Sequence, residues 1–326
     1  MERKLKEFLD TIPINWILSG EPWVRYRALL DIFGKRETDG EVVAARESVR
    51  NHILIRRIFE GQNRKGYWGN PDDIYKWFPK KSTTFWILGM LADFGLARDD
   101  ERIARACEYV FSTQTASGGF GWAPPPTPAD CFTGILTESL AKLGYLHDPR
   151  LKRAYEWLLR RQRLDGGFWC KKTGLPGAGR QKEPSCAFAT LVVLGAFAEN
   201  PGLKRSKVVR RAVEFLLACW ERRGKMKYAG HDSQIGRGWE KLKYPFTDYR
   251  ILKHLDVLSR FSSTRKDSRM EEMVGVLIDK ADEEGRFYAE SVHRVWSDFD
   301  FSQKERPSRW ITLLVHTIVR RIVLPS

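Results

Sequence analysis

The chain has 326 residues, a net charge of +15 and a hydrophobic content of 42%, so it is long and apolar enough to form a sizeable packed core. Its five cysteines show no paired spacing, which argues against a disulfide framework, and no apolar run reaches the ~18 residues of a membrane span. These features exclude small disulfide-rich and membrane-spanning proteins, and we expect a cytoplasmic location.

The excess of basic residues restricts the partners. Lys and Arg number 56 against 41 Asp and Glu, with basic pairs such as Arg160-Arg161 and Arg210-Arg211 on segments expected to be polar. A solvated basic surface accounts for this charge. The alternatives are peripheral contact with an anionic membrane and capture of a diphosphate group. No nucleic-acid-binding motif accompanies the charge, so we expect no nucleic-acid partner.

An apolar helix is predicted first, over Trp23–Phe33, and after it a short pattern returns along the chain: Gln, three residues, Gly, one residue, aromatic. Full copies run from Gln62 to Trp68, Gln114 to Phe120 and Gln162 to Phe168, and degraded copies from Trp220 to Met226 and Ala281 to Phe287. The copies are 52, 48, 58 and 61 residues apart. A recurrence of this kind indicates an array of similar supersecondary units.

Each copy separates two kinds of predicted helix. Apolar residues at i, i+3 and i+4 predict an amphipathic helix before the motif, as at Ala106–Val110 and Ala154–Leu158. More uniformly apolar helices follow it, predicted at Phe85–Phe94, Cys131–Leu143, Cys186–Ala198, Asp248–Leu258 and Trp310–Val319. Residues that suit a helix N-cap stand at their starts: Ser82-Thr83, Asp130, Ser185, Thr247 and Ser308. The predicted fold is therefore all-α, one domain over residues 1–326 built from five to six helical hairpins.

The motif, with an aliphatic residue four positions before each Gln (Ile58, Val110, Leu158), resembles the QW motif of squalene-hopene and oxidosqualene cyclases. A weaker form occurs in protein prenyltransferase β subunits. The resemblance implies an (α/α) toroid with apolar helices around a central cavity. It also implies an isoprenoid, prenyl-diphosphate or other long apolar ligand, and terpenoid cyclisation or prenyl transfer as the activity.

The resemblance singles out Asp130 and Cys131 as candidate catalytic residues. Squalene cyclases carry an Asp-x-Asp-Asp-Thr motif at the start of an inner helix, and the comparable segment here reads Asp130-Cys131-Phe132-Thr133. Prenyltransferases hold zinc through an Asp-x-Cys pair, whereas Asp130 and Cys131 are adjacent. We therefore assign no metal site, and the sequence leaves the cofactor unknown. The alternative role for Asp130 is that of a helix N-cap.

A second acidic candidate is the pair Asp298 and Asp300, which follows Gly285 as Asp130 follows Gly118. Two carboxylates suit Mg²⁺ on a diphosphate, or acid and base roles. The alternative is that both residues lie in a loop and form ion pairs with nearby basic residues. Other residues at starts of apolar helices are expected to line the ligand cavity: Trp86, Cys186, Asp248, Tyr249 and Trp310.

Three functions remain open from the sequence. Aromatic side chains around a cavity stabilise carbocations by cation–π attraction, which suits a cyclase, although core packing is the better explanation for each ring taken singly. A toroid without its catalytic motifs is instead a non-catalytic lipid- or protein-binding scaffold. A sugar-processing toroid requires a carboxylate pair, for which Asp130 and Asp248 serve only if their helices face each other.

Overall fold

The computed structural model describes residues 2–69, 83–122, 127–169, 185–225, 238–246 and 249–324. Contacts within the chain define two compact units. Unit 1 comprises Met1–Glu60, Phe94–Leu96 and Gly238–Ser326, and unit 2 comprises Gly61–Asp93 and Ala97–Arg237. The single domain over residues 1–326 stays a prediction.

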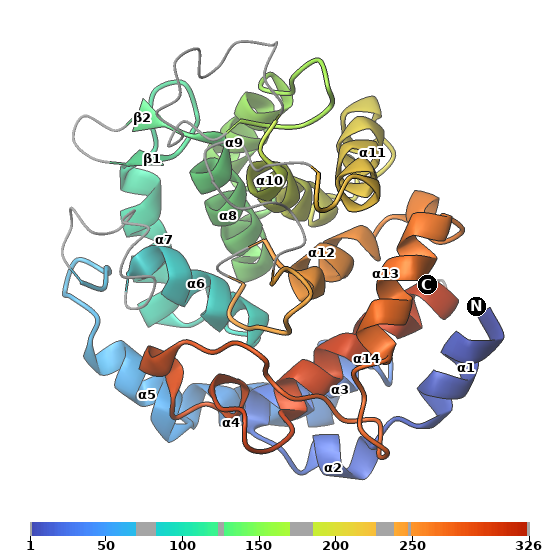
Figure 1. Cartoon of the computed structure of the whole chain (residues 1–326). Coiled ribbons are helices and arrows are strands. Elements are labelled where there is room, and N and C mark those ends of the chain that lie inside the picture. The colour runs from blue at the N-terminus through green and yellow to red at the C-terminus, as the bar shows by residue number, and fades with distance from the viewer. Residues whose placement is uncertain are drawn as a thin grey trace. The chain divides into compact units, whose positions relative to one another are not determined.

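Unit 2 alternates apolar and amphipathic helices (Figure 1). The apolar helices are α6 (Thr84–Asp93), α8 (Asp130–Leu140, continued by a π-helical turn at Ala141–Tyr145) and α10 (Ala187–Ala198). The amphipathic helices are α7 (Glu101–Ser112), α9 (Pro149–Leu159) and α11 (Lys207–Glu221). A two-stranded antiparallel ribbon, β1 (Gly121–Trp122) and β2 (Thr127–Pro128), precedes α8. Every residue of α8 and α10 is buried, as expected for helices that are apolar around their circumference.

Unit 1 contains both ends of the chain. Its helices are α1 (Glu2–Asp10), α2 (Ile14–Leu18), α3 (Pro22–Asp31), α4 (Gly40–Asn51), α5 (Ile53–Glu60), α12 (Ile251–Leu258), α13 (Ser268–Ile278) and α14 (Arg309–Val323). Short 3-10 turns lie at Ser262–Thr264, Arg294–Trp296 and Asp300–Ser302. The terminal helices α1 and α14 lie side by side (Figure 1). No helix among the described residues is long and apolar enough to cross a membrane.

The motif glutamines connect each turn to the next amphipathic helix. Gln114 Nε2 donates hydrogen bonds to the carbonyl oxygens of Gly118, at 2.8 Å, and Arg150, at 2.9 Å, and Arg150 lies in the first turn of α9. The same pair of bonds joins Gln62 to Gly66 and Arg102, and Gln162 to Gly166 and Val208. One side chain therefore fixes a turn and docks the following hairpin against it.

The motif glycine is required by both backbone angle and space. Gly118 has φ of 100°, and a Cβ added there would lie 2.7 Å from the carbonyl oxygen of Arg153 on α9. Gly66 and Gly166 repeat this arrangement against Arg105 and Arg211. An L side chain therefore meets strain and a backbone clash at the same position.

The motif aromatic is anchored through its backbone. The N–H of Phe120 donates to Thr133 Oγ1 on α8 at 2.9 Å. Equivalent bonds, each of 2.9 Å, join Trp68 to Thr84, Phe168 to Thr190 and Phe287 to Thr312. A threonine in the first turns of each of these apolar helices thus satisfies a buried donor of the preceding motif.

The last copy of the motif, in unit 1, replaces glutamine by another side chain. His316 Nε2, on α14, lies 3.0 Å from the carbonyl oxygen of Gly285, the atom that corresponds to the Gly118 acceptor of Gln114. The imidazole also stacks on Phe8 of α1, with ring centroids 4.6 Å apart. The histidine therefore supplies the missing contact and packs α1 against α14.

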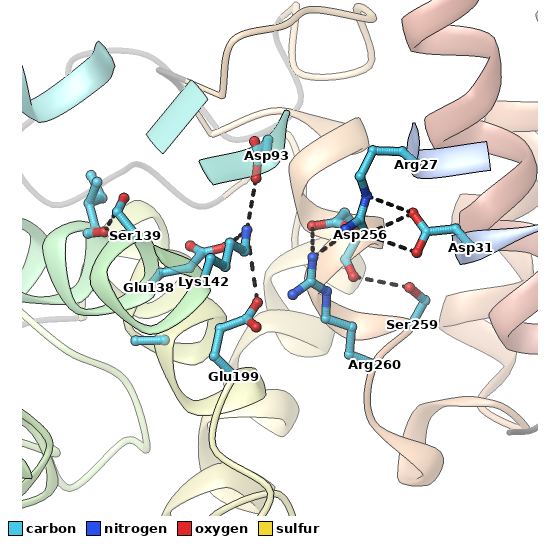
Figure 2. Close-up of polar contacts among 12 residues, drawn as sticks. Arg27, Asp31, Asp93, Glu138, Ser139, Lys142, Glu199, Asp256, Ser259 and Arg260 are labelled. Atoms are coloured by element: carbon cyan, nitrogen blue, oxygen red, sulfur yellow. Dashed lines mark hydrogen bonds and ion pairs between the residues drawn. The ribbon is translucent and has the colours of Figure 1, made fainter. Parts of the chain in front are cut away.

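A cation joins the C-terminal ends of three apolar helices in unit 2. Lys142 Nζ lies 3.0 Å from Asp93 at the end of α6, 2.8 Å from Glu138 on α8 and 3.8 Å from Glu199 after α10 (Figure 2). All four side chains are largely buried, and Gly195 of α10 leaves the space that Glu138 occupies. A positive charge at helix C-termini is electrostatically favourable.

The predicted apolar helices agree with the structure to within a few residues at their ends; α14, for example, continues to Val323, beyond the predicted end at Val319. Ser308 caps α14 as predicted, and its hydroxyl accepts from the N–H of Ile311. The cap of α10 is Cys186 rather than Ser185, whose hydroxyl donates instead to Asp165. Helix α12 begins at Ile251, so the start predicted at Asp248 is too early. Asp248, Ser82 and Thr247 lie outside the described residues.

Candidate functional site

Asp130 is the first residue of α8, but its side chain does not cap the helix. The N-cap position is Ala129, and the buried carboxylate of Asp130 accepts from Arg161 Nε at 3.0 Å and from the backbone N–H of Trp169 at 2.9 Å. The N-cap interpretation of Asp130 is therefore wrong, because these donors lie after α9 and hold the carboxylate. A cation and an N–H donor both stabilise its charged form.

The other candidates of unit 2 are core residues at starts of apolar helices. Cys131 is fully buried beside Asp130, and Trp86 is buried next to Phe85, with ring centroids 4.7 Å apart. Phe85 in turn contacts Phe132 of α8, with centroids 5.0 Å apart. Cys186 Sγ accepts from the N–H of Ala189 at 3.4 Å, so its thiol has a capping role. Their role as ligand-cavity residues stays a prediction.

Tyr249 and Trp310 lie in unit 1 at the starts of α12 and α14. Tyr249 is buried and contacts Trp239 and His254, with ring centroids 5.9 and 5.3 Å apart. Burial lowers the pKa of His254 to about 3, so this imidazole is neutral at physiological pH. Asp248, the remaining cavity candidate, lies outside the described residues.

The two carboxylates of the second acidic pair have different surroundings. Asp298 is 67% exposed and lies 3.7 Å from the Arg57 guanidinium in a solvated ion pair. Asp300 is 6% exposed and begins a 3-10 turn directed toward the start of α14. The chain therefore separates them, and only Asp300 lies in a water-poor environment.

Among the described residues, the side-chain hydrogen bonds of Asp300 involve one carboxyl oxygen. Its Oδ2 accepts from the Ser308 hydroxyl at 3.0 Å and from the backbone N–H of Trp310 at 3.2 Å. Its Oδ1 is buried and has no hydrogen-bond partner there. Burial, together with the charge of Glu21, raises the pKa of Asp300 to about 6. Asp300 is thus a carboxyl group that takes up a proton near neutral pH.

Buried aromatic rings surround this carboxyl group, and they form what we call the unit 1 aromatic cluster: Trp23, Phe94, Tyr244, Phe299, Phe301 and Trp310. Ring centroids are 4.8 Å apart between Trp23 and Phe94, and 5.2 Å apart between Phe94 and Trp310. Both sequence neighbours of Asp300 and one of its hydrogen-bond donors belong to the cluster. The Asp300 carboxyl group therefore lies next to the rings of the unit 1 aromatic cluster.

Metal binding has little support in the described part of the chain. No group of three or more His, Cys, Asp or Glu side chains there is arranged to hold a metal ion. The Asp130 carboxylate, which belongs to the pair compared with the zinc ligands of prenyltransferases, is engaged by Arg161.

Alternating apolar and amphipathic helices, joined by glutamine-fixed turns, define an all-α protein of helical hairpins. Residues 77–263, more than half of the chain, match the family model described as the squalene-hopene cyclase C-terminal domain. The chain therefore belongs to the squalene-hopene cyclase C-terminal domain family. The predicted fold class, an all-α fold of the (α/α) toroid type, and the predicted relation to terpenoid cyclases are confirmed. No curated protein matches the sequence.

Several solved structures are similar to this chain. A polysaccharide lyase is 11% identical, with 98% of this chain and 97% of that chain covered and a TM-score of 0.51. A protein from Actinoplanes is 13% identical, with 93% and 90% covered and a TM-score of 0.48. The type II terpene cyclase MstE from Scytonema is 13% identical, with 82% and 95% covered and a TM-score of 0.33. At such identities, the likeness to the lyase concerns the fold alone.

Sequence reasoning missed two residues that decide the chemistry of the acidic candidates. Arg161 lies 31 positions after Asp130 and was grouped with the surface charges, and Glu21 lies far upstream of Asp300 in the sequence. No local pattern connects either residue with its carboxylate. Only the fold brings these charges together.

Proposed function

We propose that this protein binds an isoprenoid or other long apolar ligand and starts its cyclisation by proton transfer from Asp300. The observation that carries the proposal is the combination of a buried carboxyl group, with a pKa of about 6, and the unit 1 aromatic cluster. Membership of a cyclase-type family supports the ligand class. Ligand contact by Trp310 and Tyr249 in unit 1 belongs to the same proposal.

The proposed step is a protonation of a carbon–carbon double bond. The O–H bond of Asp300 breaks, the proton forms a new C–H bond with the π electrons, and the neighbouring carbon becomes a cation. Nearby aromatic faces lower the energy of that cation through cation–π attraction. Ring closure follows when a second double bond attacks the cation, and the final cation loses a proton to water. The reaction therefore consumes no net proton.

Asp130 is the less suitable acid, although it has the sequence position expected for one. Its carboxylate is held by a guanidinium and a backbone N–H, and both partners favour the ionised form. Asp300 has no cationic partner among the described residues, and its surroundings favour the protonated form. We therefore assign Asp130 with Cys131 a supporting role beside α8 and the acid role to Asp300.

The test is turnover of linear polyprenes by the purified full chain. Squalene and geranylgeranyl compounds would be incubated with the wild type, Asp300→Asn and Asp130→Asn, and the products analysed by mass spectrometry. We expect cyclic products from the wild type and a loss of about 100-fold or more for Asp300→Asn, because general acids contribute 10²–10⁴-fold. Retained turnover in Asp300→Asn, or its loss only in Asp130→Asn, would contradict the assignment. Binding of these compounds without turnover would favour a non-catalytic lipid-binding scaffold.

A further inference from the structure

Four buried polar atoms near the start of α14 have no hydrogen-bond partner among the described residues. They are Asp300 Oδ1, Glu21 Oε2 and the indole nitrogens of Trp23 and Trp310. Buried polar groups are nearly always paired in folded proteins, and each exception requires an explanation. All four atoms belong to residues of unit 1. Protons, water or a polar group of a ligand are small enough to pair with such atoms.

Two contacts bring the chain on either side of Glu21 close to the segments that flank Asp300. On one side, a Cβ added to Gly20 would lie 2.6 Å from Arg309 Cδ, so the chain just before Glu21 abuts the first residue of α14. On the other side, the Trp23 ring lies 5.4 Å from the ring of Phe299, which precedes Asp300. Glu21 lies between these contacts at the N-cap position of α3, and its side chain caps nothing there.

No cation neutralises the two carboxyl groups in the described part of the chain. The Arg309 guanidinium donates to the carbonyl oxygen of Trp16 at 2.9 Å and lies over the Trp16 ring. His52 contacts the edge of Trp23, with centroids 4.9 Å apart, and its Nδ1 accepts from the N–H of Leu54. The pair therefore carries like charges in a water-poor environment, and it cannot lose both protons easily.

We propose that Glu21 is a positioning residue that shares one proton with Asp300 and resupplies it from solvent after each transfer. This proposal rests on the acid role of Asp300. Asp300 is 6% exposed, whereas Glu21 is only partly buried, so the glutamate side of the pair is the one nearer to water. After Asp300 has given its proton to the ligand, a proton from water reaches Glu21 and passes to Asp300 Oδ1, directly or through one water molecule. The two unpartnered oxygens are the atoms that such a transfer uses.

The sharing makes Asp300 a proton donor over a wider pH range. A neighbouring carboxylate disfavours ionisation of Asp300, which agrees with the contribution of Glu21 to its raised pKa. Removing the charge of Glu21 should therefore leave Asp300 in place but ionise it at lower pH. A merely structural role of Glu21 makes no such prediction.

The experiment measures the titration of Asp300 by carboxyl carbon NMR in the wild type, Glu21→Gln and Glu21→Asp, without any ligand. We expect the titration midpoint to fall by about one pH unit in Glu21→Gln and to stay near the wild-type value in Glu21→Asp, which keeps the charge. Glu41→Gln, which removes an exposed carboxylate paired with Lys35 in the same unit, is the matched control. Its midpoint should not move.

Turnover adds a second readout. The basic limb of the kcat profile should move to lower pH in Glu21→Gln, with roughly tenfold lower turnover at pH 7 but only about twofold lower turnover at pH 5. An unchanged Asp300 midpoint in Glu21→Gln overturns the role of Glu21, even if Asp300→Asn is inactive. Full turnover of Asp300→Asn, by contrast, removes the proposed function while the NMR result still decides whether the two groups share a proton.

Discussion

Asp130 of unit 2 and Asp300 of unit 1 are both buried carboxyl groups beside the first turn of an apolar helix, yet their surroundings are opposite. The Asp130 carboxylate accepts hydrogen bonds from the Arg161 guanidinium and the Trp169 N–H, and both donors stabilise its charge. One carboxyl oxygen of Asp300 accepts hydrogen bonds from a hydroxyl and an N–H. Asp300 has no cation among its described partners, and the charge of Glu21 raises its pKa. The partners of the first group favour its charged form, whereas burial and the charge of Glu21 raise the pKa of the second.

The comparison shows that the repeat sets the position of a carboxyl group, whereas the surrounding residues set how easily it ionises. Unit 2 follows the motif closely: its turns carry glutamines that donate to equivalent carbonyls, and its charges are paired. Unit 1 departs from the motif, with His316 in place of a glutamine contact and with carboxyl oxygens of Glu21 and Asp300 that have no partner among the described residues. Local rules of stability are most often broken at functional sites, so the irregular unit is the better place to look for chemistry.

If the regularity of unit 2 serves stability, the largest effect should come from a motif glycine. Gly118→Ala places a Cβ at positive φ against the Arg153 carbonyl, so we expect the free energy of unfolding to fall by about 3 kcal/mol. Urea unfolding followed by circular dichroism measures this change. Gly224→Ala is the control, because Gly224 also has positive φ but no atom within 4 Å of its Cβ position, and it should cost only about 1 kcal/mol. Equal costs at the two sites would refute the close-approach explanation.

The next effect tests the ion pair of Asp130. Arg161→Gln leaves a buried carboxylate with its Trp169 bond but without its cation, and we expect a loss of about 2 kcal/mol. The expected loss is below the range for fully buried pairs because the Arg161 side chain is 48% exposed. Thermal unfolding of Arg161→Gln, Asp130→Asn and the double variant forms the test. The double variant should recover part of the loss, and strict additivity would show that the two residues do not interact.

Much of the fold could be predicted from the sequence because its signals are local. The spacing of Gln114, Gly118 and Phe120 marks a turn, and apolar periodicity marks the helices on either side. Cap positions were less predictable, since Cys186 and Ser185 compete for one turn and the choice depends on Asp165, which is distant in sequence. The π-helical turn at Ala141–Tyr145 also had no signal that we recognised.

The candidate site could be predicted only in part. Asp130 was found from its resemblance to the acidic motif of squalene cyclases, and the pair Asp298 and Asp300 from its spacing after the motif glycine Gly285. Which of them is protonated depends on Arg161 and Glu21, whose positions relative to the carboxyl groups are set by packing. Charge environments are long-range consequences of a fold, so periodicity and motif spacing contain no information about them.

A smaller effect separates Asp300 from an ordinary surface acid. Its folded-state pKa of about 6 lies above the unfolded value, so its stabilising contribution is present at pH 4 and is lost as pH rises through 6. Asp300→Asn does not titrate and should be more stable than the wild type by up to about 2 kcal/mol at pH 7.5, with the difference vanishing near pH 4. Denaturant unfolding at both pH values measures this. A variant less stable than the wild type at pH 7.5 would show that the ionised carboxylate is needed for folding.

The smallest expected change in stability at neutral pH comes from replacing His316, which takes the place of a motif glutamine in unit 1. His316→Gln keeps an N–H donor for the Gly285 carbonyl but loses the stacking on Phe8, so it should cost about 1 kcal/mol at pH 7. Burial lowers the pKa of His316 to about 4, below its unfolded value, so the wild type loses stability as pH falls from 6.5 toward 4. Glutamine does not titrate, and the deficit of the variant should therefore disappear or reverse by pH 5. The remaining histidines are the same in both proteins, so their contribution cancels in the difference. A deficit that is the same at pH 7 and pH 5 would mean that His316 is not held neutral, and that its contact with Gly285 is not the counterpart of the glutamine contacts in unit 2.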